Sequence, residues 1–396
     1  MPDLLVISHA CFTAINRSIY RNFKEGWTVE LVVPKILKFP SGMRTAEPPK
    51  EGDPPIHYLS MTGNNPRIFR FEGLISLLDQ KKPEIILLDN DPISRIALTV
   101  GKWCRKNHSK LFCISCENLS LSLSDTIRRR GWKAIPAALF KRALLRRTKK
   151  LVDGVFTINN DGKRIFIEEG FKRVERMPLG FDPEYFFPDD KERERLRIKL
   201  GLQKTVVAYF GRIIPEKGVH ILIKALEPLK KYEWELMIDE FDEYASEYNG
   251  RINRLLIRLG ILDRVVNVHP DHFQIGGYMN AADIVVVPSV SKPNWKEQYG
   301  RVAAEAMACG KIVIASDSGS LPELLNDHGL IFKEGNIDEL SGLLRKIFTH
   351  QMVKIPEGKL IAKYAEQQLS LLKQREILKN VFNPQLKANQ TSTNLE

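Results

Sequence analysis

The sequence predicts an α/β protein with two Rossmann-like domains, each built on a parallel β-sheet. Its 396 residues are enough for two domains with separate cores. Short apolar, β-branched runs of the kind found in buried parallel strands recur along both halves of the chain. Segments of helical period separate these runs, and strands that alternate with helices favour right-handed parallel crossovers.

The first half of the chain follows this alternation. Strands are expected at 4–7, 29–33, 85–88, 111–115 and 155–158, and helices around 18–24, 71–80, 94–107, 134–148 and 162–169. The stretch 39–55 is rich in Pro, Gly and charge, which predicts a loop.

The second half begins with a charged helix, predicted at 190–200. Its strands are expected at 206–210, 235–238, 265–268, 284–287, 312–315 and 329–332. A long helix is expected over about 360–382. The tail 383–396 is polar and poor in apolar residues, so it is predicted to be disordered.

Composition favours a cytoplasmic enzyme and argues against an integral membrane protein. No apolar stretch approaches the ~20 residues of a membrane-spanning helix. The chain starts Met-Pro-Asp and lacks the basic start of a signal peptide. The five cysteines form no paired CxxC clusters, and Cys113 and Cys116 end a predicted strand, where buried thiols are expected.

The net charge of +12 is concentrated in one segment, residues 128–150, which holds ten Lys and Arg and no acid. Apolar residues such as Trp132 and Phe140 are interleaved with them. A basic amphipathic segment of this kind can lie on an anionic bilayer surface. A solvated helix covering its own core is the alternative. No aromatic-basic nucleic-acid module is recognisable, so we expect no nucleic-acid partner and a possible place on the inner face of the plasma membrane.

Two carboxylates, Glu297 and Glu305, stand eight positions apart between the strands predicted at 284–287 and 312–315. Residues 299–301 then fall at a helix N-terminus, where free N–H groups and the helix dipole hold anions. Carboxylates at the carboxyl ends of parallel strands suit sugar and ribose hydroxyls. A solvent-facing Glu and an ordinary helix cap are the alternative, because such spacing arises often by chance.

A second motif strengthens the functional interpretation. The strand at 206–210 is followed by GRIIPEKG (211–218), in which Arg212 and Lys217 are five positions apart. A rigid Arg fork and a compact Lys charge make a good clamp for a diphosphate. The motif is neither a Walker loop nor a GxGxxG turn. Two exposed basic residues on a loop are the alternative, and the pairing with the first motif argues against it.

Together these motifs resemble those of the family 4 glycosyltransferases, retaining enzymes with the GT-B fold, in which two Rossmann-like domains face each other across a cleft. The resemblance covers most of the second half. It also includes PLGFD (178–182), FP (187–188), AD (282–283), VPS (287–289), Trp295, SG (318–319), PE (322–323) and GLIF (329–332). It implies an acceptor-side domain at 1–180, joined by the helix at about 360–382, and a nucleotide-sugar-binding domain at 181–359.

The resemblance implies transfer of a sugar from a nucleotide-diphosphate donor to a hydroxyl acceptor, in surface polysaccharide or glycolipid synthesis, without metal or other cofactor. Arg212 and Lys217 would stabilise the leaving diphosphate, and Glu297 would hold the sugar hydroxyls near the anomeric carbon. The donor-binding residues would be Gly211, Gln298, Tyr299, Gly300, Arg301 and Glu305, with Glu305 on the ribose. A nucleotide-sugar epimerase or phosphorylase, and a non-catalytic scaffold in a membrane assembly, are the alternatives.

The acceptor side is less specific in sequence. Its candidates follow predicted strands and are His9, Asn16, Arg17, Asp91, Glu117 and Asn118. The sequence Asp-Asn-Asp at 89–91 looks like the metal-binding DxD of the unrelated GT-A fold. No nucleotide motif precedes it, so an acceptor-hydroxyl role or a simple turn fits better. The acids in 239–242 replace a Gly-rich turn of the relatives, and the sequence leaves their role open.

Overall fold

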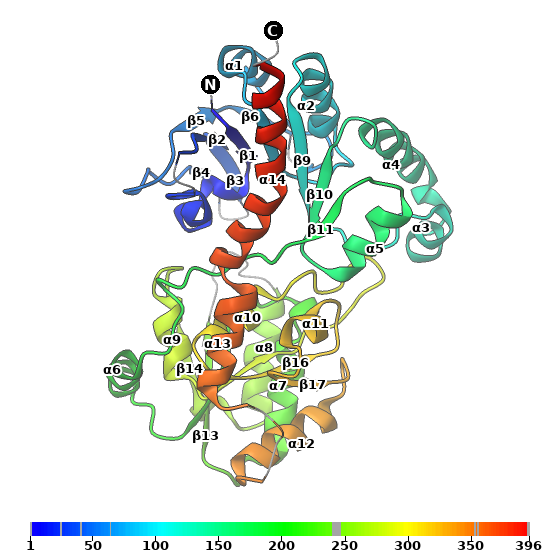
Figure 1. Cartoon of the computed structure of the whole chain (residues 1–396). Coiled ribbons are helices and arrows are strands. Elements are labelled where there is room, and N and C mark those ends of the chain that lie inside the picture. The colour runs from blue at the N-terminus through cyan, green and yellow to red at the C-terminus, as the bar shows by residue number, and fades with distance from the viewer. Residues whose placement is uncertain are drawn as a thin grey trace. The chain divides into compact units, whose positions relative to one another are not determined.

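The computed structural model describes residues 2–23, 26–39, 42–63, 65–239, 247–351, 354 and 356–393, the last ten of these by their backbone alone. The chain divides into two units, each seen in Figure 1. Unit 1 comprises Met1–Gly180 and Leu371–Glu396, and unit 2 comprises Phe181–Ser370. The division after residue 180 coincides with the predicted one. Unit 2 extends beyond the predicted limit of 359, because α13 (Gly358–Leu369) lies within it.

Unit 1 is built on a seven-stranded sheet in the order β11-β10-β9-β8-β1-β2-β5, and all its pairs are parallel. The strands are β1 (Leu4–Ser8), β2 (Val29–Pro34), β5 (Ile56–Leu59), β8 (Ile85–Asp89), β9 (Lys110–Ser115), β10 (Gly154–Thr157) and β11 (Val174–Arg176). The five predicted strands are confirmed. The other two, β5 and β11, are short, half-buried strands at the sheet edges, where apolar patterning is weak.

The helices predicted around 71–80, 94–107, 134–148 and 162–169 are confirmed, whereas α3 was not predicted and the N-terminal helix differs. The helices of unit 1 are α1 (Leu74–Lys81), α2 (Arg95–Lys106), α3 (Leu123–Arg130), α4 (Ile135–Thr148), α5 (Asn160–Glu168) and α14 (Leu371–Thr393), with 3₁₀ turns η1 (Ala10–Phe12), η2 (Ala14–Tyr20) and η3 (Trp132–Ala134). The helix predicted at 18–24 is η2. Within the predicted loop, β4 (Gly42–Thr45) pairs antiparallel with β3 (Ile36–Phe39). The β4 residues are all exposed, so the sequence lacks the alternation of apolar and polar residues that predicts a strand. A further pair joins β6 (Met61–Thr62) to β7 (Arg70–Phe71).

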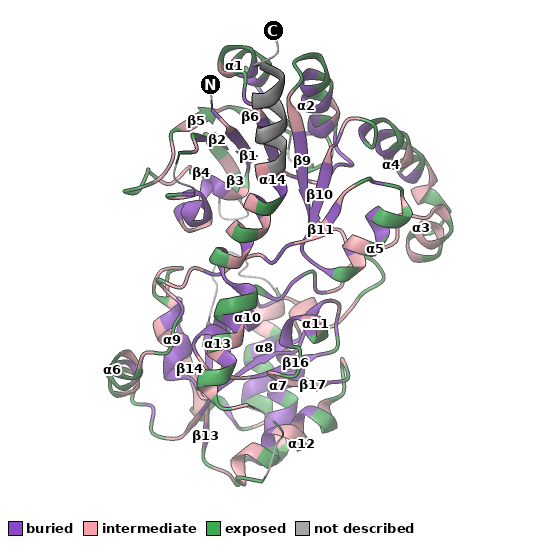
Figure 2. Cartoon of the chain, viewed as in Figure 1, coloured by how far each residue is buried: buried purple, intermediate pink, exposed green. Residues whose placement is uncertain are grey.

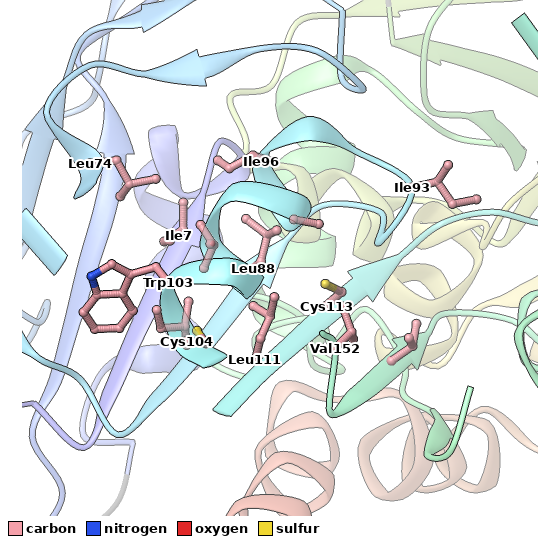
Figure 3. Close-up of a cluster of buried hydrophobic side chains, with 14 of the residues drawn as sticks. Ile7, Leu74, Leu88, Ile93, Ile96, Trp103, Cys104, Leu111, Cys113 and Val152 are labelled. Carbon is pink, nitrogen blue, oxygen red and sulfur yellow. The ribbon is translucent and has the colours of Figure 1, made fainter. Parts of the chain in front are cut away.

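Helix α2 covers one face of this sheet and forms much of its core. Figure 3 shows Cys104 of α2 beside Leu111 of β9, with Trp103 and Cys113 in the same cluster. The Trp103 indole N–H donates to Asp79 of α1 at 2.7 Å, which satisfies the polar edge of a buried ring. All five cysteines are thiols rather than disulfides, and both predicted strand cysteines are covered, Cys113 fully and Cys116 in part.

The last helix, α14, returns to unit 1 after the chain has completed unit 2. Phe382 packs on Phe112 and Phe156, whose rings leave the sheet on the face away from the α2 cluster. Arg375 donates to the Ile19 carbonyl at 2.7 Å. The single helix predicted over 360–382 is therefore two helices, separated at Ser370, whose backbone is extended. Helix α14 continues to Thr393, so the tail predicted as disordered is helical to that residue.

Unit 2 is built on a six-stranded parallel sheet in the order β14-β13-β12-β15-β16-β17. The strands are β12 (Thr205–Tyr209), β13 (Trp234–Asp239), β14 (Val265–Val268), β15 (Ile284–Val287), β16 (Ile312–Ser316) and β17 (Leu330–Phe332). All six are at predicted positions. The helices are α6 (Asp190–Leu200), α7 (Val219–Leu226), α8 (Glu247–Arg258), α9 (Ile275–Ala281), α10 (Arg301–Ala308), α11 (Leu321–Leu325), α12 (Ile337–Phe348) and α13, with 3₁₀ turns η4 (Pro215–Lys217), η5 (Glu227–Leu229) and η7 (Leu262–Arg264).

The strand order of each sheet marks where a ligand would bind. In unit 2 the order reverses between β12 and β15, and in unit 1 between β1 and β8. Open α/β sheets bind ligands outside the carboxyl ends of the strands at such a switch point. The central strands are buried along their length, as Figure 2 shows in purple, so polar chemistry is confined to the loops that leave them. Among the described residues, no helix has the length and apolar character needed to cross a bilayer.

Candidate active site

Three loops leave the carboxyl edge of the unit 2 sheet around its switch point. One joins β12 to α7 and carries Arg212 and Lys217. The next joins β15 to α10 and carries Glu297, and the third joins β16 to α11 and carries Gly319. Both sequence motifs therefore reach the same edge of one sheet.

The side chains of Lys217 and Glu297 meet directly, although 80 positions separate them. The Lys217 ammonium donates to Glu297 Oε2 at 2.7 Å, and Ser289 Oγ donates to the same oxygen at 2.7 Å. Lys217 Nζ also lies 5.5 Å from the ring centroid of Trp295. Glu297 is only 6% exposed, so this carboxylate is largely withdrawn from water and held by two donors.

The backbone around Glu297 is fixed by the third loop. The Ser320 N–H donates to the Glu297 carbonyl at 3.2 Å. Gly319 has a left-handed φ of +59°, and a Cβ there would lie 1.9 Å from that carbonyl oxygen. Only glycine fits this position. Ser320 Oγ is buried and, among the described residues, has no hydrogen-bond partner, so a donor group remains unsatisfied beside Glu297.

Serines and one further glutamate tie the β15–α10 loop to the sheet. Ser316 Oγ donates to the Ser289 carbonyl at 2.6 Å. Glu334 Oε2, after β17, accepts the Ser291 N–H at 3.0 Å and the Ser291 hydroxyl at 2.7 Å. Sequence reasoning assigned no role to these supporting residues. Their contacts span up to 43 positions, and the only signal in the sequence was the motif serines at 289 and 318.

The β12–α7 loop is locked against the same segment. Gly218 has a φ of +70°, and a Cβ there would lie 1.8 Å from the Pro288 carbonyl oxygen. The Val290 N–H donates to the Glu216 carbonyl at 2.8 Å. Tyr209 Oη donates to the Arg212 carbonyl at 2.7 Å, which fixes the backbone that carries the half-buried Arg212 side chain.

Asp239 is a further acid at this edge. It ends β13, is 6% exposed, and accepts the backbone N–H of Gly211. Burial raises the pKa of Asp239 to about 6, while His269 and the Gly211 N–H act in the opposite direction. The other acids of the 239–242 segment lie outside the described residues.

Helix α10 begins at Arg301, and Gly300 precedes it without any side-chain cap. The Ala303 N–H donates to the Gly300 carbonyl at 2.9 Å, and the positive end of the helix dipole lies at this start. Gln298 and Arg301 are exposed, and Tyr299 is buried. Glu305 is 8% exposed, with Arg301 Nε 3.9 Å away. Burial raises the pKa of Glu305 to about 7, and Arg301 lowers it only in part.

The predicted acceptor-side residues of unit 1 separate into two groups. Asp91, Glu117 and Asn118 follow β8 and β9, and His9 is exposed directly after β1, so these four lie at the carboxyl edge. Asn16 instead donates to the Ala10 carbonyl at 2.8 Å, within the turn that follows β1.

Arg17 does not serve as an acceptor contact in this structure. Its side chain is fully buried, and its Nε lies 3.0 Å from Asp53 Oδ2. Its two terminal nitrogens donate to the carbonyls of Glu47 and Pro48, at 3.1 and 2.7 Å. The guanidinium holds the segment between β4 and β5 in place, which is a structural role.

The two acids of the Asp-Asn-Asp sequence bind different hydroxyls. Asp89 Oδ2 accepts from Ser8 Oγ at 2.6 Å, and Asp91 Oδ1 accepts from Ser115 Oγ. Glu117 Oε2 pairs with Arg67 Nη2 at 3.1 Å. In the part of the chain that the structure describes, no three His, Cys, Asp or Glu side chains gather as metal ligands.

Comparison with known proteins finds similarity over the second half of the chain. Residues 190–368 match the family model described as glycosyl transferases group 1. The D-inositol 3-phosphate glycosyltransferase of Mycobacteroides abscessus is 35% identical over 156 residues, which is 39% of this chain and 34% of that relative. The protein of the same name from Mycobacterium ulcerans is 31% identical over 180 residues, 44% of this chain and 38% of the relative. The match spans about a third of the length of these curated relatives.

Solved structures resemble the chain over nearly its full length. Anabaena HepE in complex with UDP and glucose has a TM-score of 0.69 at 18% identity, covering 97% of this chain and 100% of that one. A glycosyltransferase from Rickettsia africae has a TM-score of 0.73 at 14% identity, covering 97% and 98%. At such identities the likeness establishes the fold, which is the two-domain GT-B fold that the sequence predicts.

Proposed function

We propose that this chain, whose residues 190–368 form a glycosyl transferases group 1 domain, is a glycosyltransferase that moves a sugar from a nucleotide-diphosphate donor to a hydroxyl acceptor. The observation that carries the proposal is the bond between Lys217 and Glu297 at the switch point of the unit 2 sheet. This contact joins the diphosphate-clamp motif to the sugar-hydroxyl motif. A structural ion pair alone would not require the uncapped helix start and the buried Ser320 hydroxyl beside it.

In this proposal three features of unit 2 bind the negatively charged diphosphate of the donor. Arg212 offers a planar fork of donors, and the start of α10 offers the positive end of the helix dipole. The Lys217 ammonium carries three N–H donors, so it can keep its bond to Glu297 while donating to a phosphate oxygen. Donors already fixed at the leaving diphosphate stabilise the charge that develops there, the largest catalytic contribution in many enzymes. These cations supply the charge that a divalent metal supplies elsewhere, so the proposal requires no metal.

In this proposal each of the two carboxylates binds hydroxyls of a different part of the donor. Glu297, held by Lys217 and Ser289, accepts from the sugar near the anomeric carbon. Glu305, further along α10, accepts from the ribose. The related Anabaena HepE structures contain UDP and UDP-glucose, which supports a uridine nucleotide sugar as the first donor to test. Retention of the anomeric configuration follows from the resemblance to family 4 enzymes.

Single substitutions in the clamp test this proposal. Arg212→Ala and Lys217→Ala should each reduce turnover by ~10²–10³, measured as acceptor-dependent UDP release, because each removes a charge from the leaving group. Lys224→Ala, an exposed lysine on α7, is the matched control and should retain wild-type turnover. Near-normal turnover in both clamp variants would refute the assignment.

The alternative functions predict other outcomes. A phosphorylase consumes inorganic phosphate, and an epimerase isomerises a nucleotide sugar supplied alone. A non-catalytic scaffold binds neither UDP nor GDP in calorimetry, and the intact Arg212, Lys217, Glu297 and Glu305 argue against it.

The acceptor's location is proposed from a surface of unit 1, the basic segment of residues 128–150 that forms the end of α3, η3 and α4. Trp132 is 72% exposed, Leu139 53% and Phe140 41%. Exposed aromatic and aliphatic side chains among ten cations fit an anionic leaflet, with rings in the interface and cations at the headgroups. We therefore place the enzyme peripherally on the cytoplasmic leaflet, acting in polysaccharide or glycolipid synthesis.

A further inference from the structure

Trp295 ends a tight turn in the β15–α10 loop, two positions before Glu297. The Lys292 N–H donates to the Trp295 carbonyl at 2.6 Å, and the Trp295 N–H donates to the Lys292 carbonyl at 3.1 Å. Pro293 occupies the second position of this four-residue turn, where proline is favoured because of its fixed φ. Two hydrogen bonds and a proline therefore fix the backbone that carries the Trp295 ring.

The backbone on both sides of this turn is anchored to other loops of unit 2. Before the turn, Glu334 Oε2 accepts the Ser291 N–H at 3.0 Å and the Ser291 hydroxyl at 2.7 Å. After the turn, the Ser320 N–H donates to the Glu297 carbonyl at 3.2 Å. The segments that follow β16 and β17 thus hold the loop in place, and the Trp295 ring is carried on a fixed frame.

The Lys217 ammonium lies over this ring while it is bound to Glu297. Its distance from the Trp295 ring centroid is 5.5 Å, within the ~6 Å at which the face of an indole attracts a cation. The Lys217 and Glu297 side chains are 23% and 8% exposed, so water screens these contacts less than it would on an open surface. Tryptophan attracts cations most strongly of the aromatic side chains, whereas a structural ion pair requires no aromatic ring.

We infer that Trp295 is a positioning residue of the proposed sugar transfer and holds the Lys217 ammonium by a cation–π contact. The inference rests on the proposed function, in which Lys217 stabilises the leaving diphosphate. Glu297 takes one of the three N–H bonds of the ammonium and the Trp295 ring attracts it as well, so the remaining donors are left to a phosphate oxygen. An unrestrained lysine would have to order its flexible stem as charge develops on the leaving group. The two contacts order it beforehand.

Fluorinated tryptophans in place of Trp295 test the cation–π contact with little change in the shape of the ring. Fluorine withdraws electron density from the ring face and so weakens its attraction for a cation. From tryptophan through monofluorotryptophan to tetrafluorotryptophan, kcat for acceptor-dependent UDP release should fall stepwise, by ~3–10-fold in total, with a smaller change in donor KM. The same replacements at Trp27, a half-buried tryptophan of unit 1, should leave kcat unchanged. An unchanged kcat across the Trp295 series, or an equal fall at both positions, would overturn the inference.

A second substitution shows whether the ring acts through Lys217. In a Lys217→Met chain, tetrafluorotryptophan in place of Trp295 should leave the residual kcat unchanged, because no cation remains for the ring to hold. A fall as large as in the Lys217 chain would contradict the assignment.

The ligand-free chain gives a readout that does not depend on activity. The fluorine NMR resonance of monofluorotryptophan in place of Trp295 should shift in Lys217→Met, which removes the cation over the ring. It should not shift in Lys224→Ala, a change of an exposed lysine on α7. A resonance that is unmoved by Lys217→Met, or moved equally by both substitutions, would show that the ring does not hold this ammonium.

These outcomes are distinct from failure of the proposed function. Wild-type turnover and its loss in Lys217→Ala test sugar transfer itself. A wild-type chain that transfers no sugar would defeat the proposed function and this inference together. Transfer that depends on Lys217 but not on fluorination of the Trp295 ring would defeat only the role of Trp295.

Discussion

Replacing Glu305 by glutamine gives a stability change whose size follows from the structure. The carboxyl is 8% exposed, and its burial raises its pKa from 4.5 to about 7. The unfolded chain ionises this group near pH 4.5, whereas the folded chain keeps it protonated to about pH 7. Folding at pH 8 therefore buries a charge that Arg301, at 3.9 Å, compensates only in part.

The sign follows from the raised pKa. The stability linked to protonation is fully present below about pH 4.5 and is lost as the pH rises through about 7. At 1.36 kcal/mol per pKa unit, the difference between the two pKa values corresponds to ~3 kcal/mol. Glutamine has nearly the same shape and no charge, so Glu305→Gln should stabilise the ligand-free protein by that amount at pH 8 and change little at pH 5.

Thermal unfolding at pH 5 and pH 8 measures this effect. For a unit of this size ~3 kcal/mol corresponds to a rise of ~6–12 °C at pH 8. Asp239, whose pKa is also raised, titrates in both proteins and so cancels in the difference. Glu194→Gln, an exposed glutamate on α6, is the control and should give no pH-dependent difference. A Glu305→Gln variant that is less stable than wild type at pH 8, or equally stabilised at both pH values, would refute the reasoning.

The affinity for UDP should change with pH in the opposite direction to the stability. Ribose hydroxyls donate to a carboxylate and so favour its charged form. Wild-type affinity for UDP should increase as the pH rises through about 7, the pKa of Glu305. The glutamine variant should lose this pH dependence and bind UDP at least ~10-fold more weakly. Unchanged UDP affinity with the predicted gain in stability would separate the buried charge from any ribose role.

Two further predictions concern the Glu297 loop and the basic segment of residues 128–150. Gly319→Ala should lower both melting temperature and turnover, since its Cβ would lie 1.9 Å from the Glu297 carbonyl oxygen; Gly342→Ala, within α12 and with nothing within 4 Å, should instead be neutral or stabilising, and equal behaviour of the two would disprove the constraint. Reversing Arg146, Arg147, Lys149 and Lys150 to Glu should abolish co-sedimentation with anionic vesicles, at ~1 kcal/mol per cation, and leave UDP affinity intact. Wild-type protein that sediments no better with anionic than with neutral vesicles would exclude the membrane surface.

The candidate donor-side residues could be predicted from the sequence because they lie in loops that follow recognisable strands. The strands of unit 2 are mostly apolar runs, and Arg212, Lys217 and Glu297 lie in the loops that follow two of them. Once the strands are placed, parallel pairing brings those loops to one edge. The sequence could not predict the distances between these side chains. The bond between Lys217 and Glu297 depends on Gly218 and Gly319, whose missing Cβ atoms let backbone segments approach closely.

The roles of the candidate acceptor-side residues were harder to predict, because their contacts are with residues far away in the sequence. Arg17 follows β1 as a ligand-binding residue would, yet it is neutralised by Asp53 in a loop further along the chain. Glu117 likewise follows β9 as a ligand-binding residue would, yet it pairs with Arg67, 50 positions earlier, and no local pattern encodes that contact.

Lys217 shows how the switch-point edge of unit 2 holds a positive charge without ligand. Lys217 is neutralised by Glu297 at 2.7 Å, so a donor phosphate must share this ammonium with a carboxylate already bound to it. In the proposed reaction, that contact holds the Glu297 side chain in position before the sugar arrives. In the same reaction, the Lys217 ammonium can stabilise the leaving diphosphate with its remaining N–H donors while it still holds Glu297.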